Sequence, residues 1–197
     1  MEEEKTVNWF ARLIGIITAP PVMAGAAAAT VRHYDPTLFG DGTTWYLVTL
    51  MLLTAIPLFS YVVAYMVPSI RAMGRKGQRK LAFIVSVICY VVGAAVCLIA
   101  KAPRIVSAFF LSYLASGGLL SLINASFKFK ASGHACGFAG PVTLVSMVIG
   151  PVALWAFALL PLVFWARLCM KRHSKGELWS GALVGIGATA VVMLIFP

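Results

Sequence analysis

Two short polar segments, residues 128–134 and 167–177, stand out in the last third of the chain because apolar sequence surrounds both. Between them they contain side chains that can hold an anion, transfer a proton or attack an electrophile: Ser132, His134, Arg167, His173 and Glu177. A histidine changes charge near neutral pH, so it can serve as a general acid, a general base or a nucleophile. An arginine binds phosphate or carboxylate oxygens through its fork of N–H groups. The set therefore predicts a site that binds an anionic group and acts on it with histidine.

The spacing within each segment favours particular contacts. Residues 132–134 predict the start of a helix, whose free N–H groups and positive dipole end suit a phosphate, and a second helix is expected to begin near Ser174. Glu177 follows His173 by four residues, so its carboxylate can accept a hydrogen bond from one ring nitrogen and leave the other as a nucleophile. Arg167 precedes His173 by six residues, and the two can meet only if the helix breaks between them.

Each of these residues also has a simpler structural explanation. The segment from Ser174 to Glu177 matches a capping box, and Ser132 is a suitable N-cap. Three further cations could contact anionic lipid headgroups: Lys171, Arg172 and Lys175. Taken together, these explanations do not account for two histidines, a carboxylate and an arginine at one membrane surface, so we favour a functional site.

A metal site is the second chemical interpretation, because His134, His173 and Glu177 make a set of two imidazoles and one carboxylate. Six cations accompany this set: Lys128, Lys130, Arg167, Lys171, Arg172 and Lys175. Positive charge repels a divalent ion and attracts an anion. We therefore expect no metal and no cofactor at this site.

The elements that must position these residues are membrane helices. Hydrophobic residues make up 61% of the 197 residues and charged residues only 11%, which excludes an ordinary soluble domain, a disordered chain and a coiled coil. A bilayer core about 30 Å thick requires about 20 helical residues per crossing. Six apolar runs reach about this length: 9–31, 45–67, 81–100, 105–124, 135–165 and 178–196. We expect an all-α, polytopic membrane helix bundle in which residues 1–197 form a single integral membrane domain.

The run 135–165 is too long for one crossing, and Gly150-Pro151 near its middle is a turn signal. Splitting it into a helical hairpin of about 132–149 and 151–168 gives seven spans, with six as the alternative. With seven spans, 13 of the 16 Lys and Arg residues fall on one face, whereas six spans divide them nine to seven. The positive-inside rule therefore favours seven spans and predicts a multi-pass protein of the cytoplasmic membrane whose site faces the cytoplasm.

The two polar segments resemble the motifs of the type 2 phosphatidic acid phosphatase superfamily. Ala131-Ser-Gly-His134 is similar to its PSGH motif, and Ala166-Arg-xxxxx-His173-xxx-Glu177 is similar to its SRxxxxxHxxxD motif, with the same spacing from Arg to His to the acid. The resemblance covers about residues 124–190. It implies a helical core like that of these phosphatases and metal-independent hydrolysis of a phosphate ester or diphosphate on a lipid-like substrate.

The resemblance also implies roles for individual residues. By analogy, His173 attacks phosphorus and forms a phosphohistidine, Glu177 orients His173, and His134 protonates the leaving oxygen and later helps to activate water. Three groups are implied to hold the phosphoryl oxygens: the Arg167 guanidinium, the Ser132 hydroxyl and the Gly133 N–H. Phosphoryl transfer of this kind depends mainly on positioning and charge stabilisation, which suits a cationic site.

The chain departs from the family pattern at several positions. Ala131 stands in place of proline, Ala166 in place of serine and Glu177 in place of aspartate, and the extra methylene of glutamate alters its reach. The family's first motif, KxxxxxxRP, is absent, and we expect Lys130 and Arg79 to replace its cations in phosphate binding. The chain looks like divergent prokaryotic members of the superfamily, in which a Lys-x-Ser-x-His arrangement follows an Asn-containing helix end.

The function we expect is that of a membrane phosphatase that hydrolyses a lipid or isoprenoid phosphate or diphosphate through a phosphohistidine. Its partners are then a lipid-linked phosphate substrate and membrane lipids, and not nucleic acid, because the sequence has no soluble basic domain. The alternative is a non-enzymatic membrane protein that binds anionic lipid or a partner through the same basic face. A transporter or channel is disfavoured because the ionisable residues cluster at the ends of the spans and not in their middles.

Overall fold

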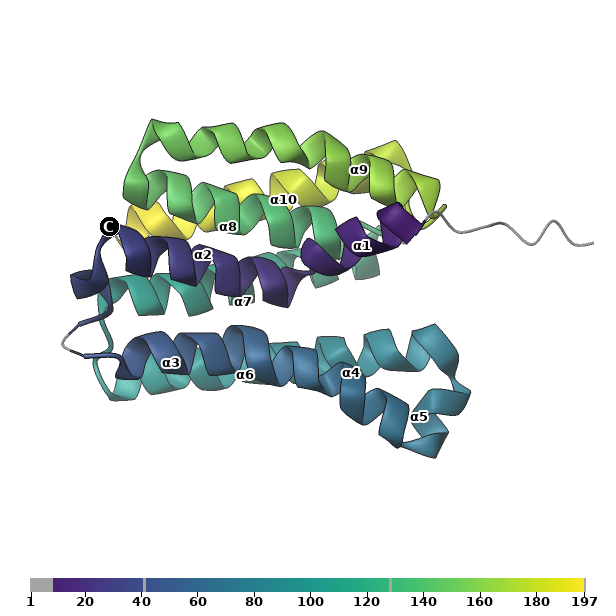
Figure 1. Ribbon diagram of the computed structural model, residues 1–197, viewed down its shortest axis with the longest axis horizontal. Coiled ribbons are helices and arrows are strands. Elements are labelled where there is room, and N and C mark those ends of the chain that lie inside the picture. Colours follow the sequence, from purple (N-terminus) through teal and green to yellow (C-terminus); the bar gives the residue numbers. More distant parts are fainter. Residues whose placement is uncertain (1–8, 41, 128, 197) are drawn as a thin grey trace, which may run out of the picture.

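The computed structural model describes residues 9–40, 42–127 and 129–196, and these ranges form helices joined by short turns, without a strand (Figure 1). The elements in chain order are α1 (Trp9–Ile17), α2 (Pro20–Tyr34), the 3₁₀ turn η1 (Pro36–Phe39), α3 (Thr44–Leu50), the π-helical turn η2 (Met51–Ala55), α4 (Ile56–Met66), α5 (Pro68–Ala72), α6 (Gly74–Ile99), α7 (Arg104–Ser126), α8 (Gly133–Ile149), the 3₁₀ helix η3 (Pro151–Leu159), α9 (Leu160–Cys169) and α10 (Lys175–Ile195). The prediction of an all-α fold is confirmed for the described residues.

Five helical segments are long and apolar enough to cross a membrane. They are Thr44–Met66, Gly74–Ile99, Arg104–Ser126, Pro151–Cys169 and Lys175–Ile195. The bent pair of α1 and α2 adds a sixth if the two helices count as one span. These lengths support a polytopic membrane protein. The seventh span of the prediction corresponds to α8, an apolar helix of 17 residues that is shorter than these five segments.

Prolines mark the positions where the first two apolar runs depart from a regular helix. Pro20 begins α2 after a break at Thr18 and Ala19, and α1 and α2 are bent relative to each other by 52°. Because proline lacks a backbone N–H, it cannot continue the hydrogen-bond ladder of α1. Pro57 lies at the start of α4, directly after the π-helical turn η2, and the segment continues through it.

The long apolar run divides at Gly150, as the sequence predicts. Helix α8 ends at Ile149, Gly150 has a φ of +106°, and Pro151 begins η3. Glycine adopts this positive φ without a steric penalty, and proline can open a helix but not continue one. The chain therefore reverses and runs back through η3 and α9 alongside α8 (Figure 1).

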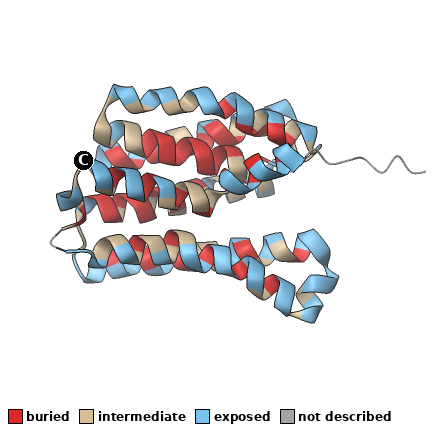
Figure 2. Cartoon of the chain, viewed as in Figure 1, coloured by how far each residue is buried: buried red, intermediate tan, exposed pale blue. Residues whose placement is uncertain are grey.

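Helix α8 is the most enclosed part of the bundle. All residues from Ala135 to Leu144 are buried, and α2, α7, α10 and η3 pack around this helix (Figure 2). Small residues permit the close approach: a Cβ on Gly185 of α10 would lie 2.5 Å from the Cys136 carbonyl oxygen, and a Cβ on Gly137 would lie 2.5 Å from the Pro20 Cβ. The packing of α10 on α8 brings the first turns of both helices to the same place.

The turns of the bundle gather at two ends (Figure 1). One end holds the start of α1, the short helix α5, the turn between α7 and α8 and the turn between α9 and α10. The opposite end holds η1, the turn between α6 and α7, the turn between α8 and η3 and the end of α10. The two predicted polar segments therefore lie at the same end.

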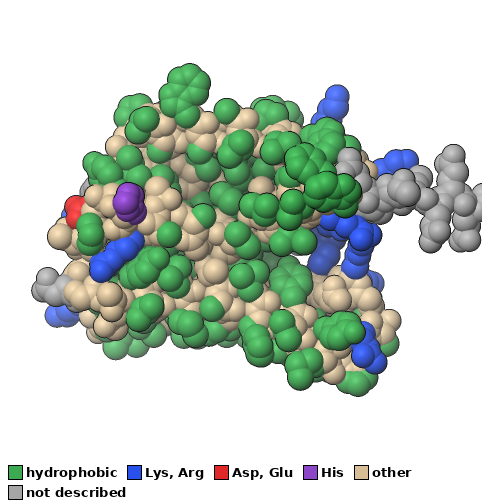
Figure 3. All heavy atoms as spheres, viewed as in Figure 1, with side chains coloured by type: hydrophobic (Ala, Val, Ile, Leu, Met, Phe, Trp, Pro, Cys, Tyr) green, Lys and Arg blue, Asp and Glu red, His purple; other side chains and the backbone are tan. Residues whose placement is uncertain are grey.

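Cations are concentrated at the first of these ends, which we call the basic end. Of the 14 Lys and Arg residues in the described part of the chain, eleven belong to it: Arg12, Arg71, Arg75, Lys76, Arg79, Lys80, Lys130, Arg167, Lys171, Arg172 and Lys175. The other three belong to the opposite end: Arg32 in the last turn of α2, Lys101 in the turn between α6 and α7, and Arg104 at the start of α7. Figure 3 shows Lys and Arg side chains gathered mainly at the basic end. This separation of cations between the two ends agrees with the division that the 132–168 hairpin predicts. The two remaining cations, Lys5 and Lys128, lie outside the described residues.

Candidate active site

The two polar segments meet at the basic end. The Ser132 backbone N–H donates a hydrogen bond of 2.8 Å to the Glu177 carbonyl oxygen, which ties the start of α8 to the first turn of α10. Arg167 lies in the last turn of α9, and the Arg172 backbone N–H donates to its carbonyl oxygen at 3.1 Å. The chain therefore breaks after α9 and folds back, which is the break that the spacing of Arg167 and His173 requires.

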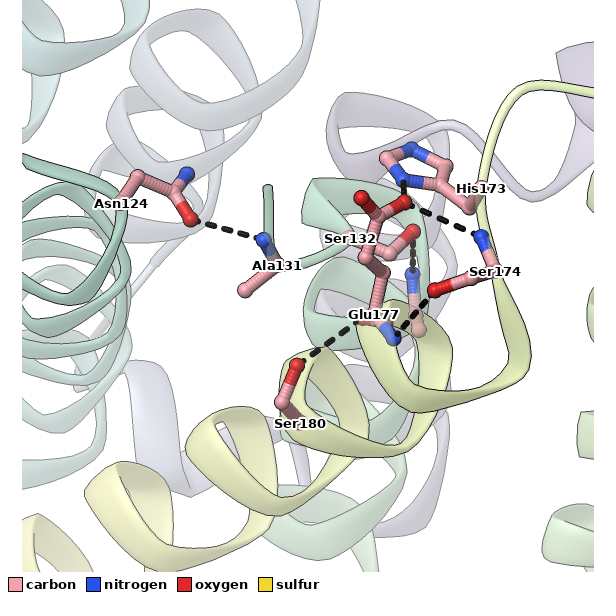
Figure 4. A network of polar contacts seen from close by, with 8 residues as sticks. Asn124, Ala131, Ser132, His173, Ser174, Glu177 and Ser180 are labelled. Carbon is pink, nitrogen blue, oxygen red and sulfur yellow. Dashed lines mark hydrogen bonds and ion pairs between the residues drawn. The ribbon is translucent and has the colours of Figure 1, made fainter. Parts of the chain in front are cut away.

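His173 and Glu177 form a hydrogen-bonded pair. His173 Nδ1 lies 2.9 Å from Glu177 Oε2, and the two side chains are 7% and 20% exposed (Figure 4). Because an ionised carboxylate only accepts hydrogen bonds, Nδ1 carries the hydrogen and Nε2 keeps a lone pair. Figure 4 shows the second ring nitrogen directed away from Glu177. The carboxylate thus fixes the orientation of the imidazole and leaves one ring nitrogen with a lone pair.

This contact arises from helix capping and not from stacking along a helix. Helix α10 begins at Lys175, so His173 precedes the N-cap Ser174 and lies outside the helix. The Glu177 carboxylate reaches back to accept from the Ser174 N–H at 3.1 Å, and Ser174 Oγ accepts from the Glu177 N–H at 3.3 Å. The capping box and the histidine pair therefore coexist and share one oxygen, Oε2. The longer glutamate side chain suits this arrangement, because a capping box uses Glu or Gln at this position.

Burial sets the charge state of His173. It lowers the pKa of the imidazole below its ordinary value of 6.5, and the positive charges of Lys130 and Arg79 act in the same direction. The hydrogen bond and the negative charge of Glu177 raise the pKa and offset part of this effect. The net shift is downward, so the ring is neutral at pH 7. A neutral imidazole is the form that a nucleophile requires.

Arg167 is a buried cation without an anionic partner in the described part of the chain. Its side chain is 2% exposed, Nη2 donates to the Gly15 carbonyl oxygen at 3.0 Å, and Nε has no hydrogen-bond partner there. The two described carboxylates are engaged elsewhere, Asp35 in its own turn and Glu177 with His173. A buried charge with no counter-charge is destabilising, so this guanidinium is suited to an anionic ligand.

The three residues at the start of α8 offer different groups. Ser132 is fully buried and caps the helix, with Oγ accepting from the Ala135 N–H at 3.4 Å, so the predicted N-cap is confirmed. Its hydroxyl hydrogen can still donate to a phosphoryl oxygen. Gly133 is the first helical residue, where the backbone N–H has no partner within the helix. His134 follows and interacts electrostatically with four basic side chains: Arg167, Arg172, His173 and Arg79.

The two residues expected to replace the missing first motif also lie at the basic end. Lys130 is exposed and interacts electrostatically with both His173 and Glu177. Arg79 is exposed on α6 and interacts electrostatically with His173 and His134. Their exposure places them at the rim of the site, where they supply positive charge. All eight predicted site residues thus share one end of the bundle.

Two contributors to the site were not predicted from the sequence. Gly15 of α1 supplies the carbonyl oxygen that holds Arg167, and its only signal is a small residue inside an apolar run. Tyr61 of α4 interacts electrostatically with Arg79 and Arg167, and nothing in its apolar surroundings distinguishes it from other aromatic residues. Both come from helices that are remote in sequence from the two polar segments.

The described side chains around His173 can be compared with the ligand sets that metal ions require. Among the described residues, no three His, Cys, Asp or Glu side chains lie close enough together to form a set of ligands. Glu177 Oε2 already accepts hydrogen bonds from His173 and Ser174. Positive charge dominates the surroundings, and it favours an anion over a divalent cation.

Comparisons of the chain with protein-family models, curated proteins and solved structures find no match. Function is therefore inferred from the chemistry of the site and not from relatives. The features that bear on it are a neutral histidine oriented by a carboxylate and a buried arginine at the same end of the bundle.

Proposed function

We propose that this chain is a membrane phosphatase that hydrolyses a lipid or isoprenoid phosphate or diphosphate through a phosphohistidine intermediate, as a divergent relative of the type 2 phosphatidic acid phosphatases. The observation that carries the proposal is the His173–Glu177 pair, which leaves one ring nitrogen with a lone pair. The buried guanidinium of Arg167 at the same end supports it: among the described residues it has no carboxylate partner and its Nε has no hydrogen-bond partner, so a phosphate can supply the negative charge.

The proposed reaction has two steps. In the first, His173 Nε2 attacks phosphorus, the bond from phosphorus to the leaving oxygen breaks, and His134 gives that oxygen a proton. Glu177 stabilises the positive charge that develops on the His173 ring. In the second, water attacks the phosphohistidine, His134 takes a proton from the water, and orthophosphate leaves with the free imidazole restored.

The remaining predicted residues hold the phosphoryl group during both steps. Arg167, the Ser132 hydroxyl and the Gly133 N–H bind its oxygens, with Lys130 and Arg79 adding charge from the rim. His134 interacts electrostatically with basic neighbours, and the negative charge of a bound phosphate dianion would favour its protonated form. Substrate binding thereby prepares the general acid, and no metal ion is needed to stabilise the transferred group.

We further propose seven spans, with α8 and the η3–α9 segment as two separate crossings of the cytoplasmic membrane. Two observations support this topology. Successive turns of the chain lie alternately at the two ends of the bundle, and eleven of the described cations lie at the basic end, as the positive-inside rule expects of a cytoplasmic face. The basic end then faces the cytoplasm, with the phosphate at headgroup level and the lipid tail among the helices.

One observation favours a second candidate, a non-enzymatic membrane protein that binds anionic lipid or a partner through the basic end. Ser132 and Glu177 both take part in helix caps, which gives each a structural role without catalysis. Anionic headgroups are attracted to such a concentration of cations. The two candidates differ in whether phosphate is released.

The deciding experiment measures phosphate release by the purified chain from a panel of lipid and isoprenoid phosphates, with and without EDTA. We expect EDTA to leave the rate unchanged and His173→Ala or His134→Ala to reduce turnover by about 10³-fold or more. His33→Ala is the matched control, because His33 is exposed in the last turn of α2, next to η1 at the opposite end of the bundle. Full turnover by a folded His173→Ala protein would overturn the mechanism, and no release by the folded wild-type protein across the panel would favour the binding role.

A further inference from the structure

Helices α6 and α7 touch closely in one half of the bundle and separate in the other. A Cβ on Gly93 of α6 would overlap the ring of Phe110 of α7, so the two helices are in direct contact there. About one turn closer to the basic end, the ring centroids of Tyr90 and Tyr113 lie 5.3 Å apart, and both side chains are buried. Every described residue of α7 after Ser116 is partly or fully exposed. The two helices therefore diverge from the tyrosine pair toward the basic end.

The face of α6 that packs on α7 in the second half of the helix is open in its first half. Four residues share this face because they follow one another at intervals of four, three and four: Arg79, Phe83, Ser86 and Tyr90. Tyr90 is buried, whereas Phe83 is 49% exposed and Arg79, at the rim of the site, is exposed as well. A mainly apolar strip thus runs along α6 from the cationic rim to the tyrosine pair.

The facing strip on α7 leads to the first turn of α8. Leu120 follows Tyr113 by seven residues, so it lies on the same face of α7, two turns closer to the basic end. A Cβ on Gly133 would lie 3.8 Å from Leu120 Cδ2, and the Gly133 N–H is a proposed ligand of the phosphoryl group. We call the space between the two strips the α6–α7 cleft. Figure 3 shows the surface dividing at the basic end between the α4–α6 pair and the helices above it.

The depth of the cleft matches one leaflet of the membrane. Leu120 lies seven residues from Tyr113 and Arg79 lies eleven residues from Tyr90, which correspond to about 10 Å and about 16 Å of helix. Half of the hydrocarbon core is about 15 Å thick, so the tyrosine pair lies near the middle of the bilayer. Within the bilayer no water fills a space between two spans, so hydrocarbon does. The tail of a lipid whose phosphate is bound at His173 is the hydrocarbon that begins at the mouth of this cleft.

Tyr90 and Tyr113 close the inner end of the cleft as a fixed pair. The Tyr113 hydroxyl donates a hydrogen bond of 3.3 Å to the Pro20 carbonyl oxygen, which holds this side chain at the break between α1 and α2. The Tyr90 ring is tilted against it by 56°, and the contact of Gly93 with Phe110 lies directly behind the pair. Close-packed side chains resist the insertion of further methylene groups. A tail longer than the cleft must therefore fold back or leave it sideways.

We propose that the α6–α7 cleft binds the hydrocarbon tail of the substrate, and that Tyr90 and Tyr113 end the cleft and make the enzyme selective for tails about one leaflet long. The inference rests on the proposed function and deepens it by assigning tail selectivity to two residues. Both tyrosines lie at the far end of the cleft from His173, so they determine which lipid binds and take no part in phosphoryl transfer.

The first test changes the closed end and varies the tail. Values of kcat/KM are measured in neutral detergent for geranyl, farnesyl and geranylgeranyl phosphates with wild type, Tyr90→Ala and the matched control Tyr90→Phe, which keeps the ring. We expect wild type and Tyr90→Phe to favour farnesyl over geranylgeranyl phosphate by about 10-fold, and Tyr90→Ala to lose this preference because its cleft is longer. The same preference in a folded Tyr90→Ala protein would overturn the role of the tyrosine pair.

The second test fills the cleft and does not depend on turnover. Ser86→Trp puts a large ring on the open face of α6, and Ile88→Trp puts the same ring on the opposite face, where Ile88 is 56% exposed. Calorimetry measures the affinity for farnesyl phosphonate and for methyl phosphonate, which has the same headgroup without the tail. We expect wild type and Ile88→Trp to bind farnesyl phosphonate about 10-fold or more tightly than methyl phosphonate. Ser86→Trp should lose this difference and keep its affinity for methyl phosphonate.

The outcomes separate the cleft from the proposed function. An equal tail preference in Ser86→Trp and Ile88→Trp would overturn the cleft and assign the space to ordinary membrane lipid. A tail preference that Ser86→Trp removes, in a protein that releases no phosphate from any lipid, would support the cleft while refuting the phosphatase. Phosphate release without any preference among the three tails would support the phosphatase while refuting the cleft.

Discussion

Replacing Gly15 by alanine tests whether α1 positions Arg167 for phosphate binding. A Cβ on Gly15 would lie 2.9 Å from Arg167 Nη2 and 3.3 Å from Met170 Cε. Ordinary contact between such atoms begins near 3.5 Å, so the guanidinium must move by about 0.6 Å. The same residue carries both the new methyl group and the carbonyl oxygen that accepts from Nη2, so the shift also disturbs that 3.0 Å hydrogen bond.

The expected effect falls on activity more than on folding. A misplacement of about 1 Å at a reacting group can cost about 10²-fold in rate, so we expect kcat/KM to fall by about 10- to 100-fold. Alanine favours a helix over glycine by about 1 kcal/mol, which offsets part of the crowding at Arg167. The melting temperature should therefore change little while phosphate release declines.

The assay combines phosphate release with thermal unfolding of the same preparations. Gly117→Ala in α7 is the matched control, because a Cβ there would meet nothing within 4 Å, and it should retain full activity. Wild-type kcat/KM in a folded Gly15→Ala protein would refute the reasoning, since Arg167 would then tolerate displacement and could not be a positioned phosphate ligand.

Two further changes probe the histidine pair and the helix packing. The acidic limb of the pH profile of kcat/KM should lie below pH 6.5, because burial lowers the pKa of His173 and the neutral ring reacts. Glu177→Gln keeps a capping-box residue but removes the negative charge that raises the pKa of His173. The acidic limb should therefore move to lower pH while kcat falls. A move of the limb to higher pH would contradict the pairing of His173 with Glu177. A methyl group in Gly185→Ala would meet the Cys136 carbonyl oxygen at 2.5 Å and should destabilise the protein by about 1–3 kcal/mol. Gly187→Ala is the control and should leave the stability unchanged, because a Cβ there would meet nothing within 4 Å. Equal melting temperatures for the two variants would argue against the close α8–α10 contact.

The fold was largely predictable because its decisive signals are local. Gly150-Pro151 reverses the chain through a positive φ and a missing N–H, both of which are properties of those two residue types. Pro20 breaks the first apolar run for the same reason. The length of α8 was harder to judge, because apolar periodicity does not show where a buried helix meets the membrane surface.

The site was only partly predictable because some of its contacts join distant parts of the chain. The Ser174-x-x-Glu177 pattern could be interpreted as a capping box or as support for His173, and sequence spacing does not show that one oxygen serves both. The contact of Arg167 with Gly15 spans 152 residues, so no local pattern indicates it.

The shared oxygen of Glu177 has a consequence for the entropy of the reaction. A free carboxylate would have to be ordered against His173 in every turnover, at a cost in side-chain rotamer freedom. Here the Ser174 N–H holds Oε2 at 3.1 Å as soon as the first turn of α10 forms. The cost of orienting the imidazole is therefore met once, during folding, and the proposed nucleophile is preorganised before any substrate arrives.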